Sequence, residues 1–151
     1  MGETVDEIMI ERTIWFIFII WNSFIDIRKK EISLCSFFVV SVWRFVLVCI
    51  GREIDWMDLF VSCTPGICFL ALSLVSKNAV GVGDGLVLLV TGWYLGVFAT
   101  IEILFWGLLS SAVFSICLLL FRKIHRKTEI PFVPFLFLGY VIFAARMQGH
   151  F

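Results

Sequence analysis

The chain has 151 residues, of which 61% are hydrophobic, 17% aromatic and only 16% charged. This balance is far from that of a soluble domain and predicts an integral membrane protein surrounded by lipid. The formal net charge is zero, so the overall charge gives no indication of a nucleic-acid partner, and we expect none.

Hydropathy predicts an all-α polytopic protein with about six transmembrane helices. A spanning helix needs about 20 mostly apolar residues, because the hydrocarbon core is about 30 Å thick. Six segments approach this length: Ile8–Ile25, Ser33–Ile50, Asp58–Ser76, Gly85–Val97, Ile101–Phe121 and Pro131–Ala145. The sixth is short and carries two prolines near its start, so we expect it to tilt, to thin the bilayer locally or to re-enter.

The fourth and fifth segments run together in the sequence. As one helix of about 37 residues they would measure about 55 Å, nearly twice the membrane thickness. We therefore expect a tight turn within Gly96–Glu102. Because no repeat, low-complexity tract or long polar linker divides the chain, we expect a single membrane domain over residues 1–151. The acidic start GETVDE is unlike a secretory signal.

Lysine and arginine predict the orientation, because in short loops they stay preferentially on the cytoplasmic side. With six spans, the loops after the first, third and fifth share one side. These loops hold eight basic residues: Arg28, Lys29, Lys30, Lys77, Arg122, Lys123, Arg126 and Lys127. The opposite side has only Arg12, Arg52 and Arg146. We therefore expect a multi-pass protein of the cytoplasmic membrane with both termini outside. For Arg44, within the second segment, we expect a snorkelling or internally paired side chain.

The sequence contains few side chains in patterns that are typical of catalytic or metal-binding sites. The five cysteines are scattered through apolar segments without a CxxC pair, which predicts small buried hydrophobic residues, with neither a zinc site nor a disulfide framework. His125 and His150 form no HExxH motif, and the chain has no GxSxG motif and no phosphate-binding glycine loop. We expect no metal and no other cofactor.

Two aspartates remain as candidates. Asp26 ends the first segment in NSFIDIRKKEIS, and Asp84 opens the fourth in GVGDGL. Two spans lie between them, so the chain returns both carboxylates to one membrane face. Each has an ordinary explanation: Asp84 as a helix N-cap, and Asp26 as an interfacial acid neutralised by Arg28 and its neighbours. Together, two acids at one face can share a proton and polarise a water for attack on a peptide carbonyl.

Three motifs resemble a known family. The stretch GVGDG looks like the GxGD signature of membrane aspartyl proteases, and DIRKKEI is similar to the aspartate, basic residue and isoleucine pattern of type IV prepilin peptidases. The stretch IPFVPFLFLGY resembles the proline and phenylalanine motif that opens the last helix in that family. The motifs occur in the family's order, from the first predicted helix to the end of the chain.

The resemblance implies an aspartic-type endopeptidase that cuts pilin-like precursors, on the cytoplasmic side, between a short basic leader and a hydrophobic helix. Asp26 and Asp84 would form its catalytic pair, one activating water and the other protonating or polarising the scissile amide. Close approach of the substrate backbone would be supported by three glycines: Gly81, Gly83 and Gly85. Glu31 and Glu129 are expected at the same face, either meeting the basic leader or simply solvated.

The chain also departs from the family pattern. The lysine usual after the GxGD aspartate is missing, and Ser33 stands where a proline is common. The chain has no region with paired CxxC motifs, so it resembles the short, peptidase-only members, and we expect no methyltransferase activity.

Two alternatives stay open. One is a presenilin-like or signal-peptide-peptidase-like intramembrane protease, although its YD and PAL motifs have no match here, since Ile25 precedes Asp26 and the prolines lie in PFVPF. The other is a small non-catalytic membrane protein, such as a pore, carrier or assembly subunit, that uses its carboxylates for ions or packing.

The charge asymmetry predicts the accessibility of two loops. In a variant without the native cysteines, a single reporter cysteine in the Arg122–Lys127 loop should be protected from a membrane-impermeant thiol reagent in intact cells, since basic loops stay in the cytoplasm. A reporter at Gly51 should be labelled. The opposite pattern would reverse the predicted orientation but leave both aspartates on one face.

Overall fold

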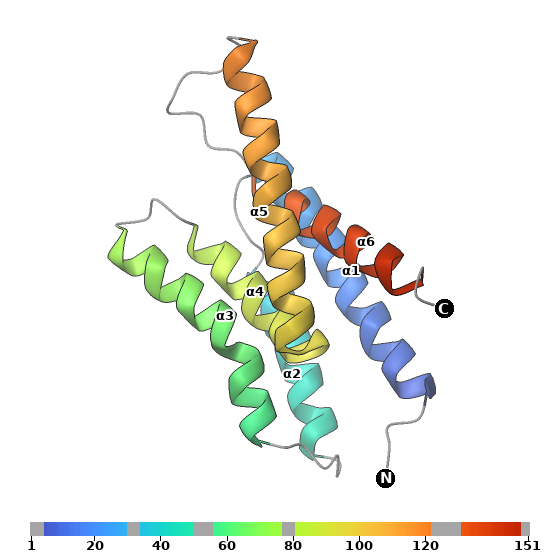
Figure 1. Ribbon diagram of the computed structural model, residues 1–151. Helices are drawn as coiled ribbons and strands as arrows, with labels where there is room; N and C mark the ends of the chain where they lie inside the picture. The colour runs from blue at the N-terminus through green and yellow to red at the C-terminus, as the bar shows by residue number, and fades with distance from the viewer. Residues whose placement is uncertain (1–4, 30–33, 50–55, 77–80, 122–130, 149–151) are drawn as a thin grey trace.

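The computed structural model describes residues 5–29, 34–49, 56–76, 81–121 and 131–148 (Figure 1). These ranges contain six helices and no strand: α1 (Val5–Lys29), α2 (Leu34–Cys49), α3 (Trp56–Val75), α4 (Val82–Leu95), α5 (Val97–Leu120) and α6 (Val133–Gln148). The predicted all-α class is confirmed for the described part of the chain. One helix corresponds to each predicted segment, and the ends differ by a few residues.

Two of the helices are long and apolar enough to cross a membrane. They are Met57–Val75 within α3 and Val97–Leu120, the whole of α5. Shorter apolar helical stretches cover Cys35–Val46, Val82–Leu95 and Val133–Arg146. Membrane association is therefore indicated by α3 and α5, and crossing by all six helices stays a prediction.

The outward faces of the helices are apolar. Large hydrophobic side chains are exposed on α2, α3 and α5, among them Phe38, Phe45, Phe60, Leu74, Phe105 and Leu119. Cysteines share these faces: Cys35, Cys68 and Cys117 are exposed. The prediction that the cysteines are buried was wrong for these three, because an apolar run does not reveal which of its residues turn outward.

A single residue separates α4 from α5. Gly96 has φ +83°, in the left-handed region that favours glycine. Its N–H donates to the carbonyl of Gly92 at 2.9 Å, and Thr100 N–H donates to the Gly96 carbonyl at 3.1 Å. The chain reverses direction here (Figure 1). The predicted turn is confirmed in place but is shorter than expected, since α5 is already helical at Val97 and includes Glu102.

Helices α3 and α4 lie side by side in close contact because glycines replace side chains between them (Figure 1). A Cβ on Gly66 would lie 2.5 Å from the Cα of Leu89, and one on Gly92 would collide with the Ser62 carbonyl oxygen. Small residues at such positions let helix backbones approach, which is how apolar helices gain packing contacts in lipid.

Helices α5 and α6 form a second close pair. A Cβ on Gly139 would collide with the carbonyl oxygen of Ile103, and one on Gly107 would lie 3.2 Å from that of Phe135. The C-terminal half of α5 projects beyond the other helices (Figure 1). The closest backbone contacts with α6 lie in the N-terminal half of α5, and farther along α5 the ring of Phe114 lies 5.4 Å from that of Phe135.

Helix α1 joins these pairs, since it packs against α6, α4 and α2. Trp15 is fully buried; its ring centroid lies 4.4 Å from that of Tyr140 in α6, and its Nε1–H donates to Thr91 of α4 at 3.2 Å. Asn22, also fully buried, exchanges hydrogen bonds of 3.0 and 3.1 Å with Ser36 of α2. Both polar contacts fix the rotation of α1 against its neighbouring helices.

The close packing of α3 on α4 predicts a cost for one added methyl group. Gly92→Ala should lower the free energy of unfolding by at least about 2 kcal/mol, because the new Cβ meets a backbone oxygen that moves only with the helix. Equilibrium unfolding of the purified wild type and variant in mixed detergent micelles measures this difference in the free energy of unfolding. The matched control is Ala71→Val on the exposed side of α3. If both variants were equally stable, the glycine contact would not limit the approach of the helices.

Candidate active site

Asp26 lies in the last turn of α1 and is buried, with 7% of its surface exposed. Its Oδ2 accepts a hydrogen bond of 3.0 Å from the backbone N–H of Val133, and the backbone of Phe132 provides a second hydrogen bond. Val133 is the first residue of α6, where N–H groups have no partner within the helix. The Asp26 carboxylate therefore supplies an acceptor, and a favourable negative charge, at the start of α6.

Asp84 lies inside the first turn of α4. Gly81 is the N-cap, with extended backbone angles and no side-chain cap hydrogen bond, and α4 begins at Val82. The N–H of Asp84 donates to the Gly81 carbonyl at 3.1 Å. The N-cap explanation for Asp84 was therefore wrong, because the helix starts three residues before the apolar run. An acid inside the first turn still benefits from the positive end of the helix dipole.

The two aspartates lie within electrostatic range of each other. The side chain of Asp84 is half-buried. Since Val133 lies 107 residues beyond Asp26 and donates to it, the start of the third motif reaches the same place. Two carboxyl groups within this range repel each other when both are ionised, and protonation of one relieves the repulsion. Such a pair can act as general acid and general base.

The three candidate glycines occupy different surroundings. A Cβ on Gly81 would lie 2.9 Å from Oδ2 of Asp84, so the missing side chain leaves room for this carboxylate. A Cβ on Gly85 would lie 2.7 Å from the side chain of Leu70, so at this position the space is used by α3. Gly83 is half-buried in the first turn of α4. Their predicted part in substrate approach stays a prediction.

The predicted partners of a basic leader, Glu31 and Glu129, lie outside the described residues, as does most of the basic loop sequence. Among the residues that the structure describes, no three His, Cys, Asp or Glu side chains gather as metal ligands would. The site, as far as it is described, consists of two carboxylates and the backbone groups around them.

The amides that bind Asp26 were not among the residues predicted from the sequence. They lie in the motif IPFVPFLFLGY, whose letters do not show that its backbone faces an aspartate. The signal was the pair Pro131 and Pro134, because prolines near a helix start mark the N–H groups that need outside acceptors.

Comparison with protein-family models, curated proteins and solved structures gave no match to the chain. The resemblance to a family therefore rests on the three sequence motifs alone.

The contact between Asp26 and α6 predicts a structural cost for removing the carboxylate. Asp26→Ala should lower the free energy of unfolding by about 1–2 kcal/mol and speed amide hydrogen exchange at Val133, since the amide loses its acceptor. Asp26→Asn keeps an acceptor oxygen and should lose less. Asp58→Ala is the matched control, because Asp58 is an exposed acid in the first turn of α3. Equal exchange rates at Val133 in Asp26→Ala and wild type would contradict this contact.

Proposed function

We propose that this protein is a membrane aspartyl endopeptidase that removes the basic leader peptide from pilin-like precursors at the cytoplasmic membrane face. The observation that carries the proposal is the convergence of Asp26 and Asp84 from helices distant in sequence, with Val133 of the third motif bonded to Asp26. The motif order suggested a shared site, and this proximity supports it.

The proposal takes all six helices as membrane spans. It is supported by the apolar length of α3 and α5 and by the exposed apolar side chains along the helices. Helix α4 has 14 residues and is about 21 Å long, shorter than the hydrocarbon core. One of its ends therefore lies below a membrane surface, and we assign Asp84 to a shallow position at the cytoplasmic side, where water and a leader peptide can reach it.

Hydrolysis would proceed through the aspartate pair. The ionised carboxylate takes a proton from water as the water oxygen attacks the scissile carbonyl carbon. The protonated carboxyl group polarises the carbonyl and then donates a proton to the leaving amine as the C–N bond breaks. Acid and base roles belong to the pair, because coupled carboxyl groups titrate together. The N–H of Val133 holds Asp26 in one orientation throughout.

A second candidate is a non-catalytic membrane protein in which the carboxylates serve structure alone. It is favoured by the same hydrogen bond from Val133, because an aspartate that caps α6 already has a structural role. The two candidates differ at Asp84, which is not the N-cap of its own helix. A presenilin-like protease would use the same pair but would cut within the substrate helix rather than after a basic leader.

Neutralising either aspartate should abolish cleavage and spare the fold. Asp26→Asn and Asp84→Asn should each reduce processing of a pilin-like precursor by at least about a hundredfold, because asparagine cannot take part in proton transfer. The double variant should be scarcely worse, as expected for residues that act as a unit. Asp84→Glu should also be strongly impaired, since one added methylene displaces the carboxylate. Precursor processing in membranes, with the amount of enzyme measured in parallel, checks each result.

Asp58→Asn is the matched control for these variants, and it should cleave like wild type because Asp58 is exposed on α3. If Asp84→Asn accumulates normally and cleaves at near wild-type rate, the protease proposal fails and the structural candidate takes its place. Cleavage within the hydrophobic helix, with the leader still attached, would favour the presenilin-like alternative.

A further inference from the structure

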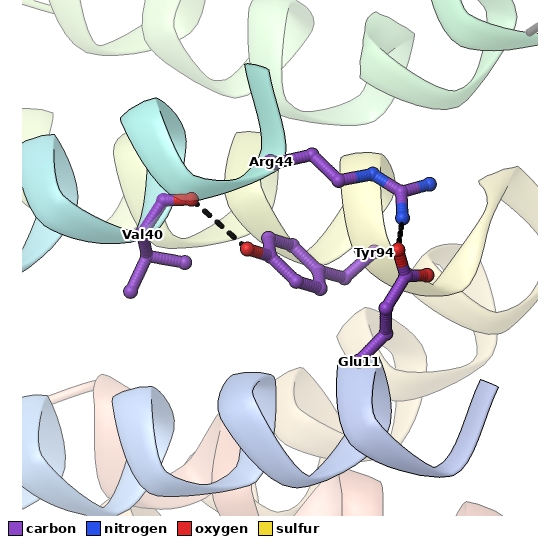
Figure 2. A network of polar contacts seen from close by, with 4 residues as sticks. All are labelled: Glu11, Val40, Arg44 and Tyr94. Carbon is purple, nitrogen blue, oxygen red and sulfur yellow. Dashed lines mark hydrogen bonds and ion pairs between the residues drawn. The ribbon is translucent and has the colours of Figure 1, made fainter. Parts of the chain in front are cut away.

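A buried polar network ties α1, α2 and α4 together. Figure 2 shows Glu11 of α1 paired with Arg44 of α2, beside Tyr94 of α4. The ion-paired side chains are only 12% exposed for Arg44 and 7% for Glu11. The Arg44 guanidinium lies 5.4 Å from the ring centroid of Tyr94, and the Tyr94 hydroxyl donates to the Val40 carbonyl of α2 at 2.9 Å. Internal pairing of Arg44, one of the two states predicted for it, is confirmed.

This network shares two helices with the aspartate pair but lies at their other ends. Along α1, Glu11 is about 22 Å from Asp26, and along α4, Tyr94 is about 15 Å from Asp84, at a rise of about 1.5 Å per residue. Between the two sites, the Trp15 to Thr91 hydrogen bond joins the same helices. Because helices are stiff over these lengths, a shift or rotation of α1 against α4 at the network moves the carboxylates as well.

The network resists such a shift for two reasons. Charged partners buried in apolar surroundings are strongly unfavourable once separated, so the Glu11 to Arg44 contact holds α1 in one register against α2. Tyr94 then fixes α2 to α4, because its ring receives the guanidinium and its hydroxyl needs an acceptor when buried. At the other end, Asp26 accepts hydrogen bonds from Val133 of α6 and from Phe132 just before it, and not from α4. The spacing of Asp26 and Asp84 therefore depends on contacts elsewhere along α1 and α4.

We infer that Glu11, Arg44 and Tyr94 form a clamp that sets the distance between Asp26 and Asp84. They are positioning residues, and their consequence for catalysis rests on the proposed function. The existence of the clamp does not rest on the proposed function, since the distance between the side chains at positions 26 and 84 can be measured without any substrate.

The test measures that distance by cross-linking. In a chain without the native cysteines, Asp26→Cys and Asp84→Cys are joined in membranes by a short bismaleimide, and the yield is compared between backgrounds. Glu11→Leu with Arg44→Met removes both charges and keeps similar volume, so no lone charge remains to prevent folding. We expect the cross-linking yield to fall at least threefold while the amount of protein stays unchanged. Exchanging the partners, Glu11→Arg with Arg44→Glu, should restore at least half of it.

The matched control is the exposed ion pair between Glu102 of α5 and Arg146 of α6, whose atoms lie 2.9 Å apart with side chains 34% and 60% exposed. Glu102→Leu with Arg146→Met should leave the yield unchanged, because exposed pairs hold helices weakly. Wild-type yield in the Glu11 and Arg44 double variant overturns the inference. So does an exchanged pair whose yield stays as low as that of the double variant.

Cleavage provides the second readout, in chains that keep both aspartates. The Glu11 and Arg44 double variant should lower kcat at least threefold with KM for the precursor unchanged, since the clamp lies far from where a leader would bind. An unchanged kcat overturns the positioning role. If the wild-type chain cleaves no precursor at all, the proposed function fails, and the cross-linking result still decides whether the clamp exists.

Discussion

The hydrogen bond from the N–H of Val133 to the carboxylate of Asp26 joins the first helix to the last, and the candidate site depends on it. Val133 is fully buried, so its amide at the helix start has no water to bind, and leaving it unpaired is costly. The Asp26 carboxylate accepts a hydrogen bond from this amide and is thereby held in one orientation. This hydrogen bond explains why the proline-rich start of α6 lies against an aspartate 107 residues earlier in the chain.

Close packing at glycines gives the rest of the bundle its stiffness. In the pair of α3 and α4, the backbones approach where Gly66 and Gly92 leave out side chains, and in the pair of α5 and α6 the same is true at Gly107 and Gly139. Between helices in lipid, where the hydrophobic drive is absent, such packing would supply much of the cohesion. Asp84 stands on α4 within the first of these pairs and is therefore positioned by a rigid neighbour.

The structure gives Asp26 two tasks that are compatible but separable. As an acceptor for Val133 it stabilises the start of α6, and as a charge within electrostatic range it acts on Asp84. Asparagine can perform the first task but not the second, which makes it the informative substitution. Glu11 and Arg44 also affect the position of Asp26, although they lie far from it. Glu11 and Asp26 share α1, and because a helix is stiff, the ion pair at one end helps to place the carboxylate at the other.

The sequence by itself determined the helices and their order. Apolar runs marked six helical segments, the combined length of the fourth and fifth required a turn near Gly96, and counting the segments predicted both aspartates at one end. These features follow from local chain length and hydropathy. Which side chains meet was decided only by the tertiary structure, because contacts depend on the rotation and register of each helix. Glu11 therefore meets Arg44, Val133 meets Asp26, Gly85 packs on α3, and Gly81 rather than Asp84 is the N-cap of α4. A linear pattern contains the residues of such contacts but not the angles that bring them together.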